Sequence, residues 1–312
     1  MNTGDRTKDL PDPSILTHVG RHMDDDRIPT LAALAASLST KGDGCATTNL
    51  AVPGVTVWRS DAPTAGEPAL FDPRFYFVLQ GRKTMTFSGT PQPMTPGMFA
   101  LSSIGVPFVT SVDEATPDAP YLGVGVVLEP TTIAALMEEL PDRPRADASS
   151  IMIGTADRGL LGPMERILTA ARHPHDAAIL GPLIVRELLY RLLTGDTADI
   201  VRQFVTGSHR MNQVRHAVSI LRRTEGTMPK VEALAAQVGM SVTSLHRHFK
   251  AVTGYGPIAY AKHLRLIAAR AALSSGGTSV TQAARAAGYL SLSQFSREYK
   301  SKFAVPPRHD TR

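Results

Sequence analysis

The sequence predicts an α+β chain in which a β-barrel with added helices is followed by an all-α part. Three observations predict this fold. Short apolar runs cut by Pro, Gly and Asp fill residues 55–128, as is typical of a small all-β barrel or sandwich. Apolar residues then recur at three- and four-residue steps, which indicates helices. Finally, residues 231–257 recur at 281–307, and each copy has the pattern of a helix, a tight turn and a second helix.

The length and the distribution of charge favour two functional parts. A chain of 312 residues is long for one domain. Residues 1–207 hold 17 Lys and Arg against 24 Asp and Glu, whereas residues 208–312 hold 16 against 4, so the net charge of +5 is the remainder of two opposite values. The basic part also contains six of the ten histidines. Such a segment predicts a polyanion as partner, and nucleic acid first.

The amino-terminal residues and the cysteine content bear on location. Residues 1–30 are polar and include three consecutive aspartates, so we expect a flexible polar arm. No signal-peptide core and no apolar run of about 18 residues occurs, which argues against secretion and against a membrane span. The single cysteine, Cys45, has no internal partner for a disulfide, and a cytoplasmic location is the simplest interpretation. Cys45 is either an inert thiol or a reactive sensor.

Residues 31–207 are predicted to fold as one unit. A short Ala/Leu helix at 31–38 precedes the strands. Six strands are predicted, at 55–59, 74–80, 83–87, 98–102, 107–112 and 121–128. Helices follow at 131–140, 160–171, 178–193 and 199–205. In the helix at 178–193, apolar residues form one stripe, namely Leu180, Leu183, Ile184, Leu188 and Leu192. This stripe either packs on the barrel or forms the seam of a homodimer.

The first helix-turn-helix copy can be assigned residue by residue. Ala235 allows close helix packing, Gly239 ends the first helix, and Ser241 caps the second, at 242–250. Leu245 and Phe249 lie one turn apart and are expected to be buried. The side chains left outside are Thr243, His246, Arg247 and Lys250. In this arrangement the second helix enters the major groove of DNA.

The second copy repeats the pattern after a long connecting helix at 258–273. Gly288 stands in the turn, and Phe295 and Tyr299 point inward. The outward side chains are Ser293, Gln294, Arg297 and Lys300. Two recognition helices joined rigidly could reach successive major-groove segments, about 34 Å apart on one side of the duplex. The two copies within one basic segment predict a sequence-specific binder of double-stranded DNA.

The residue types on these helices suit distinct roles at DNA. Arginine can pair with guanine through two hydrogen bonds, and glutamine can do so with adenine. We therefore expect base contacts, or contacts to nearby phosphates, from Arg247 and Arg297 and their helix neighbours. Four lysines are expected to hold the backbone instead, namely Lys250, Lys262, Lys300 and Lys302.

Site chemistry in the predicted barrel points away from an enzyme. No histidine lies between residues 55 and 128, so a histidine-based metal centre is not expected there. No Gly-rich phosphate loop and no nucleophile-base pair stands out, so we assign no catalytic residue, metal or cofactor. An apolar interior would instead suit an unidentified small organic effector. The candidate lining residues are Trp58, Phe75, Phe77, Met85, Phe87, Met98 and Tyr121.

Several segments resemble a known family. LHRHFK at 245–250, GYGP at 254–257, RLIAARAAL at 265–273 and AGYLSLSQFSREYK at 287–300 closely resemble the DNA-binding domain of AraC/XylS-type transcription regulators. One departure is Ala304, where the family's second copy usually has glycine. PGVTVWRS at 53–60, DP at 72–73, VLQGRK at 78–83 and APYL at 119–122 resemble the cupin-type amino-terminal domain of one subgroup.

The resemblance implies a division of labour. A cupin-like regulatory, effector-binding and dimerising barrel would occupy residues 31–207, and a double helix-turn-helix DNA-binding domain residues 208–312. It implies a homodimer, promoter DNA as partner, and RNA polymerase as a further partner if the protein activates. Two alternatives remain open at this point. One is a cupin-derived enzyme with a basic tail, and the other is a DNA-binding protein that needs no effector.

Overall fold

The computed structural model describes residues 16–19, 26–42, 45–142, 149–224, 229–274 and 277–310. Two β-sheets face each other and form a flattened barrel. The larger sheet has the strand order β1 (Leu16–Val19), β11 (Ile151–Thr155), β8 (Met98–Ser102), β5 (Arg74–Gln80), β10 (Tyr121–Val127), β3 (Val55–Ser60) and β2 (Cys45–Asn49). The smaller sheet has the order β4 (Glu67–Phe71), β9 (Val106–Glu114), β6 (Arg82–Phe87) and β7 (Thr90–Met94).

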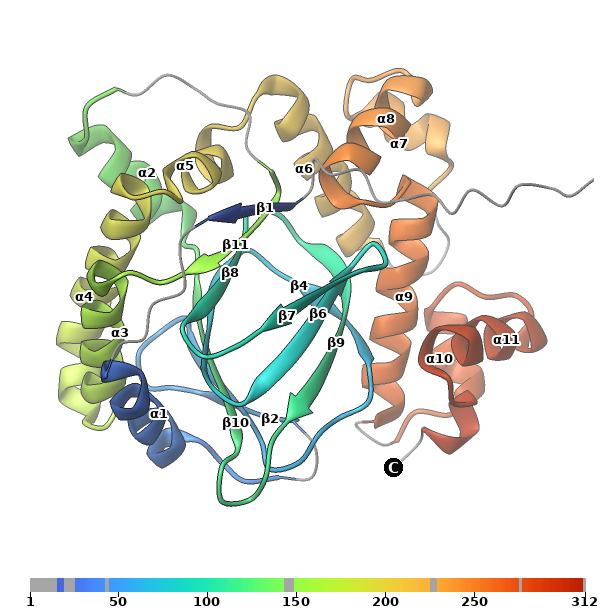
Figure 1. Cartoon of the computed structure of the whole chain (residues 1–312). Coiled ribbons are helices and arrows are strands. Elements are labelled where there is room, and N and C mark those ends of the chain that lie inside the picture. Colours follow the sequence, from blue (N-terminus) through green and yellow to red (C-terminus); the bar gives the residue numbers. More distant parts are fainter. Residues whose placement is uncertain are drawn as a thin grey trace, which may run out of the picture.

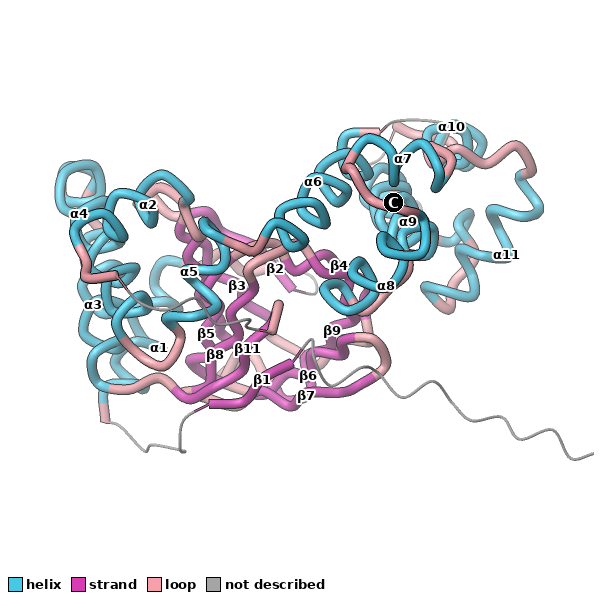
Figure 2. The backbone as a smooth tube through the Cα atoms, turned by 90° about the horizontal axis from the view of Figure 1, so that it is seen from above, coloured by secondary structure: helices cyan, strands magenta, loops and turns pink. Residues whose placement is uncertain are grey.

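Helices lie on both sides of the barrel (Figures 1 and 2). One group covers the outer face of the larger sheet: α1 (Arg27–Leu38), α2 (Pro130–Glu139), α3 (Arg158–Ala170), α4 (Pro174–Thr194) and α5 (Ala198–Thr206). The other group lies beyond the opposite side: α6 (His209–Arg223), α7 (Val231–Gln237), α8 (Val242–Thr253), α9 (Pro257–Ser274), α10 (Val280–Ala286) and α11 (Leu292–Phe303). Within the described residues, no helix is long and apolar enough to cross a membrane.

Alternation along β5 explains why the larger sheet has two buried faces. Phe75 and Phe77 belong to the core between this sheet and helices α1 to α5. Tyr76 and Val78, which point the other way, belong to the core between the two sheets. A strand buried on both faces has a continuous apolar run, and residues 75–79 of β5 form such a run.

The structure adds elements that the sequence pattern did not reveal. Strand β1 lies within the segment that we expected to be a flexible arm, and it pairs in parallel with β11. The prediction of a flexible arm is therefore wrong for residues 16–19. Residues 1–15 and 20–25 lie outside the described residues. Strand β11 returns to the sheet after helix α2, in a region predicted to be helical only. Helix α6 was also missed, although its buried Met211, Val214 and Val218 follow helical spacing.

The helical part after α5 contains two cores rather than one. Leu245, Phe249 and Tyr260 join the same cluster as the barrel interior. Phe295 and Tyr299 belong to a separate cluster built from α9, α10 and α11. The first helix-turn-helix unit is therefore continuous with the barrel, and the second stands on a core of its own.

Candidate nucleic-acid interface

The first helix-turn-helix unit, formed by α7 and α8, has the geometry expected from its sequence. Gly239 adopts φ of +69° in the turn, a conformation that favours glycine. The Ser241 hydroxyl accepts a hydrogen bond from the Ser244 backbone N–H at 3.2 Å and caps α8. Leu245 and Phe249 are fully buried, as predicted. The four candidate contact residues, Thr243, His246, Arg247 and Lys250, are all exposed.

The second unit, formed by α10 and α11, repeats this arrangement. Gly288 adopts φ of +75° in the turn. The Ser291 hydroxyl accepts a hydrogen bond from the Gln294 backbone N–H at 3.3 Å. Phe295 and Tyr299 are fully buried, again as predicted. The four candidate contact residues, Ser293, Gln294, Arg297 and Lys300, lie on the outer side of α11. Gln294 and Arg297 also line a pocket between α9 and α11.

Helix α9 joins the two units as one continuous element. At 1.5 Å per residue its 18 residues span about 27 Å. Tyr260 near its start packs into the core of the first unit, and Leu273 near its end packs into the core of the second. Arg270 of α9 also pairs with Asp310 at 2.9 Å, and Asp310 accepts a hydrogen bond from the Tyr299 hydroxyl at 2.7 Å. These contacts hold the second unit against the end of α9.

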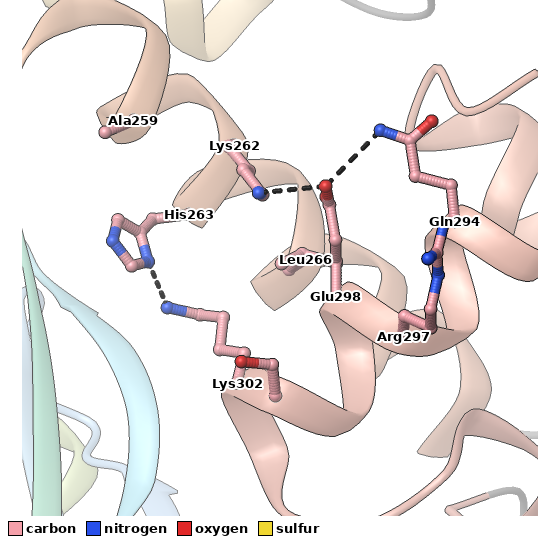
Figure 3. A pocket seen from close by; sticks show the side chains of 9 residues that line it. Ala259, Lys262, His263, Leu266, Gln294, Arg297, Glu298 and Lys302 are labelled. Carbon is pink, nitrogen blue, oxygen red and sulfur yellow. Dashed lines mark hydrogen bonds and ion pairs between the residues drawn. The ribbon is translucent and has the colours of Figure 1, made fainter.

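A pocket of about 740 Å³ lies between α9 and α11, and it changes the expected role of two lysines (Figure 3). Lys262 forms an ion pair with Glu298 at 3.0 Å. Lys302 is half-buried, and its ammonium donates to Nδ1 of His263. Both lysines were expected to hold the DNA backbone, but here each has an intramolecular partner. Lys250 and Lys300 remain exposed for that role.

The electrostatics of this pocket follow from burial. Desolvation, with the nearby Lys302 and Lys262 charges, lowers the pKa of His263 to about 4. Desolvation lowers the pKa of Lys302 to about 8. A neutral imidazole is therefore available at pH 7 to accept the hydrogen bond from the Lys302 ammonium. The Tyr255 ring packs edge-on to His263, with centroids 4.6 Å apart.

Polar contacts between described residues join the helix-turn-helix part to the barrel. The Tyr260 hydroxyl donates to the backbone oxygen of Gly105 at 2.9 Å. Arg222 of α6 pairs with Asp72 at 2.8 Å, next to the end of β4. Arg270 reaches Glu67 of β4 at 3.4 Å. Together with the shared core, these contacts dock the helix-turn-helix units onto the β4–β9 side of the barrel.

Comparisons with known proteins agree with this architecture. Residues 51–200 match the model of the AraC-type transcriptional regulator N-terminus, and residues 234–312 match that of a helix-turn-helix domain. This chain belongs to the AraC-type transcription regulators. The order of barrel and paired helix-turn-helix units is that of a DNA-binding transcription regulator with an amino-terminal regulatory domain.

Relatives of this AraC-type regulator share its two parts to different extents. The transcriptional activator NphR of a Rhodococcus species is 27% identical over 240 residues, which cover 74% of this chain and 67% of NphR. The activator RhaS of Salmonella arizonae is 39% identical over 77 residues, 25% of this chain and 28% of RhaS. Unsaturated fatty acid-bound ToxT of Vibrio cholerae has a TM-score of 0.57 at 10% identity, and the match covers 86% of this chain and 96% of ToxT.

The seven residues expected to line an effector pocket do not share one site. Met85, Phe87 and Tyr121 belong to the core between the two sheets, and Trp58 and Met98 pack against it. Phe75 and Phe77 lie on the opposite face of the larger sheet, stacked on each other in the helix-side core. They were placed wrongly because alternation along β5 turns them away from the barrel interior.

A polar group inside this apolar interior was not expected from the sequence. Lys83, 7% exposed, donates to the Tyr76 hydroxyl at 3.2 Å, and its ammonium lies 4.7 Å from the Tyr76 ring centroid. The Tyr76 and Tyr121 hydroxyls are hydrogen-bonded to each other. Among the described residues, no carboxylate pairs with Lys83. Lys83, Met85 and Phe87 alternate with more exposed neighbours on β6, a signal that could have placed Lys83 inside.

Cys45 lies beside this group, at the edge of the larger sheet. Its residue surface is exposed, yet burial around the sulfur raises the pKa of the thiol, against a smaller opposing effect of the Lys83 charge. A raised pKa keeps the thiol protonated at neutral pH, which favours the inert alternative over the reactive one.

Proposed function

We propose that this AraC-type regulator reads promoter DNA in two successive major-groove segments, with α8 and α11 as the recognition helices. The observation that supports this best is the equivalence of the two helices. Helix α8 buries Leu245 and Phe249, and α11 buries Phe295 and Tyr299. Each helix presents four polar or basic side chains on its outer side. A rigid α9 would set the spacing between the two segments. Because this regulator would bind promoter DNA, we also propose that it is located in the cytoplasm.

Selection of bound duplexes from a randomised pool tests this proposal. The full chain should enrich two sequence boxes about one helical turn apart. Arg297→Ala should flatten base preference in one box and leave the other unchanged. The matched control is Arg285→Ala, because Arg285 is an exposed arginine on α10, outside the recognition helix. Enrichment of a single box, or equal effects of both variants, would contradict two-helix reading.

We further propose that the interior between the two sheets receives a small organic effector. Two features of this interior support the proposal, namely the Lys83–Tyr76–Tyr121 group in apolar surroundings and the core that the barrel shares with the first DNA-binding unit. A ligand there could alter the position of α8 without touching it. Calorimetric titration with cellular metabolites should find a ligand whose heat is lost in Lys83→Met. Full-strength promoter regulation without any ligand would favour the effector-independent alternative.

A homodimer through the outer face of α4 is also proposed. Leu188 and Leu192 of the predicted stripe are buried in the core that α4 shares with α2, α3 and α5, so only the remaining part of the stripe is available to a partner. Ile179, Leu180 and Leu183 are exposed by 69%, 45% and 62% of their surfaces, which is a large apolar face for a helix in water. Sedimentation of the full chain should show a dimer that Leu183→Glu converts to monomer. Dimerisation unaffected by this change would place the interface elsewhere.

We propose RNA polymerase as a further partner if this regulator activates transcription. NphR and RhaS are both named transcriptional activators, which favours the same role here. In vitro transcription from a promoter with the enriched boxes should rise when this regulator is added. An enzymatic role has no support from these relatives.

A further inference from the structure

One difference between the two recognition helices bears on base reading. In α11 the Gln294 amide nitrogen donates to Oε1 of Glu298 at 3.3 Å (Figure 3). The equivalent positions in α8, 50 residues earlier, hold Ser244 and His248. Helix α11 therefore has an amide with a carboxylate beside it, and α8 has neither group at the equivalent positions.

Glu298 is held by more than its helix neighbour. Lys262 of α9 donates to the same Oε1 at 3.0 Å, and the Tyr289 hydroxyl, from the turn after α10, donates to Oε2. Glu298 is only 23% exposed at its side chain. Burial acts to raise the pKa of this carboxyl, but the hydrogen bonds from Tyr289, Lys262 and Gln294 outweigh it and lower the pKa. The carboxylate is thus charged and fixed by three separate elements.

A fixed carboxylate determines which way the Gln294 amide faces. Because a carboxylate only accepts hydrogen bonds, the amide nitrogen must turn toward Glu298 and the amide oxygen away from it. Figure 3 shows the oxygen on the far side of the amide from Glu298. The nitrogen has a second hydrogen. An outward oxygen next to an outward N–H is the pair that matches N6 and N7 of adenine.

We propose that Glu298 is a positioning residue that orients the Gln294 amide, so that the second recognition helix selects adenine. This rests on the proposed reading of DNA by α11. Without Glu298, the amide could rotate about its last bond and present either end to a base. The Gln294 side chain would then have to become ordered when DNA binds, and this cost weakens the discrimination of adenine from the other bases.

Selection of bound duplexes by the full chain tests this, because a randomised pool samples every base at every position. The wild type should enrich adenine at one position of one box, and Gln294→Ala should lose that preference. Glu298→Ala should reduce the preference at the same position by about fivefold or more, the equivalent of 1 kcal/mol. The other box should be unchanged. Glu232→Ala is the matched control, since it removes an exposed acid of α7 from the same basic part.

A base analogue separates positioning from loss of structure. With 7-deazaadenine at the selected position, the wild type should bind more weakly because the N7 acceptor is gone, whereas Glu298→Ala should bind both duplexes alike. Adenine preference retained in Glu298→Ala but lost in Gln294→Ala would overturn the inference and leave DNA reading by α11 intact. Weakening of both boxes in Glu298→Ala would show a structural role and overturn it too. Failure of the wild type to enrich any box would instead contradict the proposed function.

Discussion

At the scale of single residues, exposure on the two recognition helices follows from helical spacing alone. Leu245 and Phe249 bury one face, so Arg247 and Lys250 must lie outside it. Contacts between side chains of different elements cannot be predicted from helical spacing. Lys302 finds His263 only because α9 and α11 pack together, and nothing in local spacing predicts that contact.

Arg247 provides the residue-scale prediction for DNA. Because its side chain is exposed on α8, Arg247→Ala should weaken binding to the selected duplex by about 1–3 kcal/mol and relax preference at one base position. Competition binding against the selected and a scrambled duplex measures this. Equal weakening on both duplexes would assign Arg247 to phosphate contact.

Ala304 provides a prediction about stability. It ends α11 with φ of +61°, whereas Gly254 ends α8 at the equivalent place with φ of +76°. Because a left-handed conformation is unfavourable for alanine, Ala304→Gly should raise the free energy of unfolding by about 0.5–1 kcal/mol. Urea unfolding measures it, with Ala268→Gly at an exposed position of α9 as a control that should lower stability instead.

His263 provides a prediction about pH. Its pKa is lowered to about 4 in the folded protein, by burial first and then by Lys302 and Lys262, whereas the pKa of a histidine in an unfolded chain is about 6.5. The unfolded state therefore binds a proton that the folded state does not, and stability should fall as pH drops from about 6.5 to about 4. Urea unfolding at pH 7 and pH 5 should show a smaller loss in His263→Gln than in the wild type.

At the scale of elements, strong local periodicity predicted an element well, and short pairing segments escaped detection. Helices α8 and α11 lie where their spacing indicated. Strands β1 and β11 have only four and five residues, and their pairing joins segments more than 100 residues apart. The apolar stripe of α4 is divided: Leu188 and Leu192 pack in the core shared with neighbouring helices, whereas Leu180 and Leu183 face solvent.

Leu245 provides the element-scale prediction. Its side chain is fully buried between α8 and the shared core, so Leu245→Ala should lower the free energy of unfolding by about 2–5 kcal/mol. Leu290→Ala is the matched control, because this side chain is fully exposed in the turn before α11. Melting curves would contradict the assignment if both variants behaved like the wild type while DNA binding was lost.

At the scale of the whole molecule, the acidic part and the basic part are docked rather than merely linked. Asp72 and Glu67 of the barrel pair with Arg222 and Arg270 of the helical part. The charge division seen in the sequence thus has a structural use. DNA affinity should still depend steeply on salt, since phosphate contacts release counterions.

Tyr260 provides the prediction for this docking. Tyr260→Phe removes the buried hydrogen bond to the Gly105 carbonyl and should lower stability by about 1–3 kcal/mol, because that carbonyl loses its partner. Trp58, the only tryptophan, reports barrel unfolding by fluorescence. Tyr190→Phe, at an exposed tyrosine of α4, should leave stability within about 0.5 kcal/mol.

The amino-acid sequence alone determined the two parts, their opposite charge, the helix-turn-helix repeat and the side chains on its exposed faces. These depend on composition, on spacings of two to four residues and on the recurrence of residues 231–257 at 281–307, all of which can be read from the order of the residues. The packing of the folded chain was needed to show that Phe75 and Phe77 face the helices, that Lys83 lies inside the barrel, and that Glu298 has contacts from three elements. Such placements depend on which distant segments pack together, and that choice is made by the burial of the whole chain.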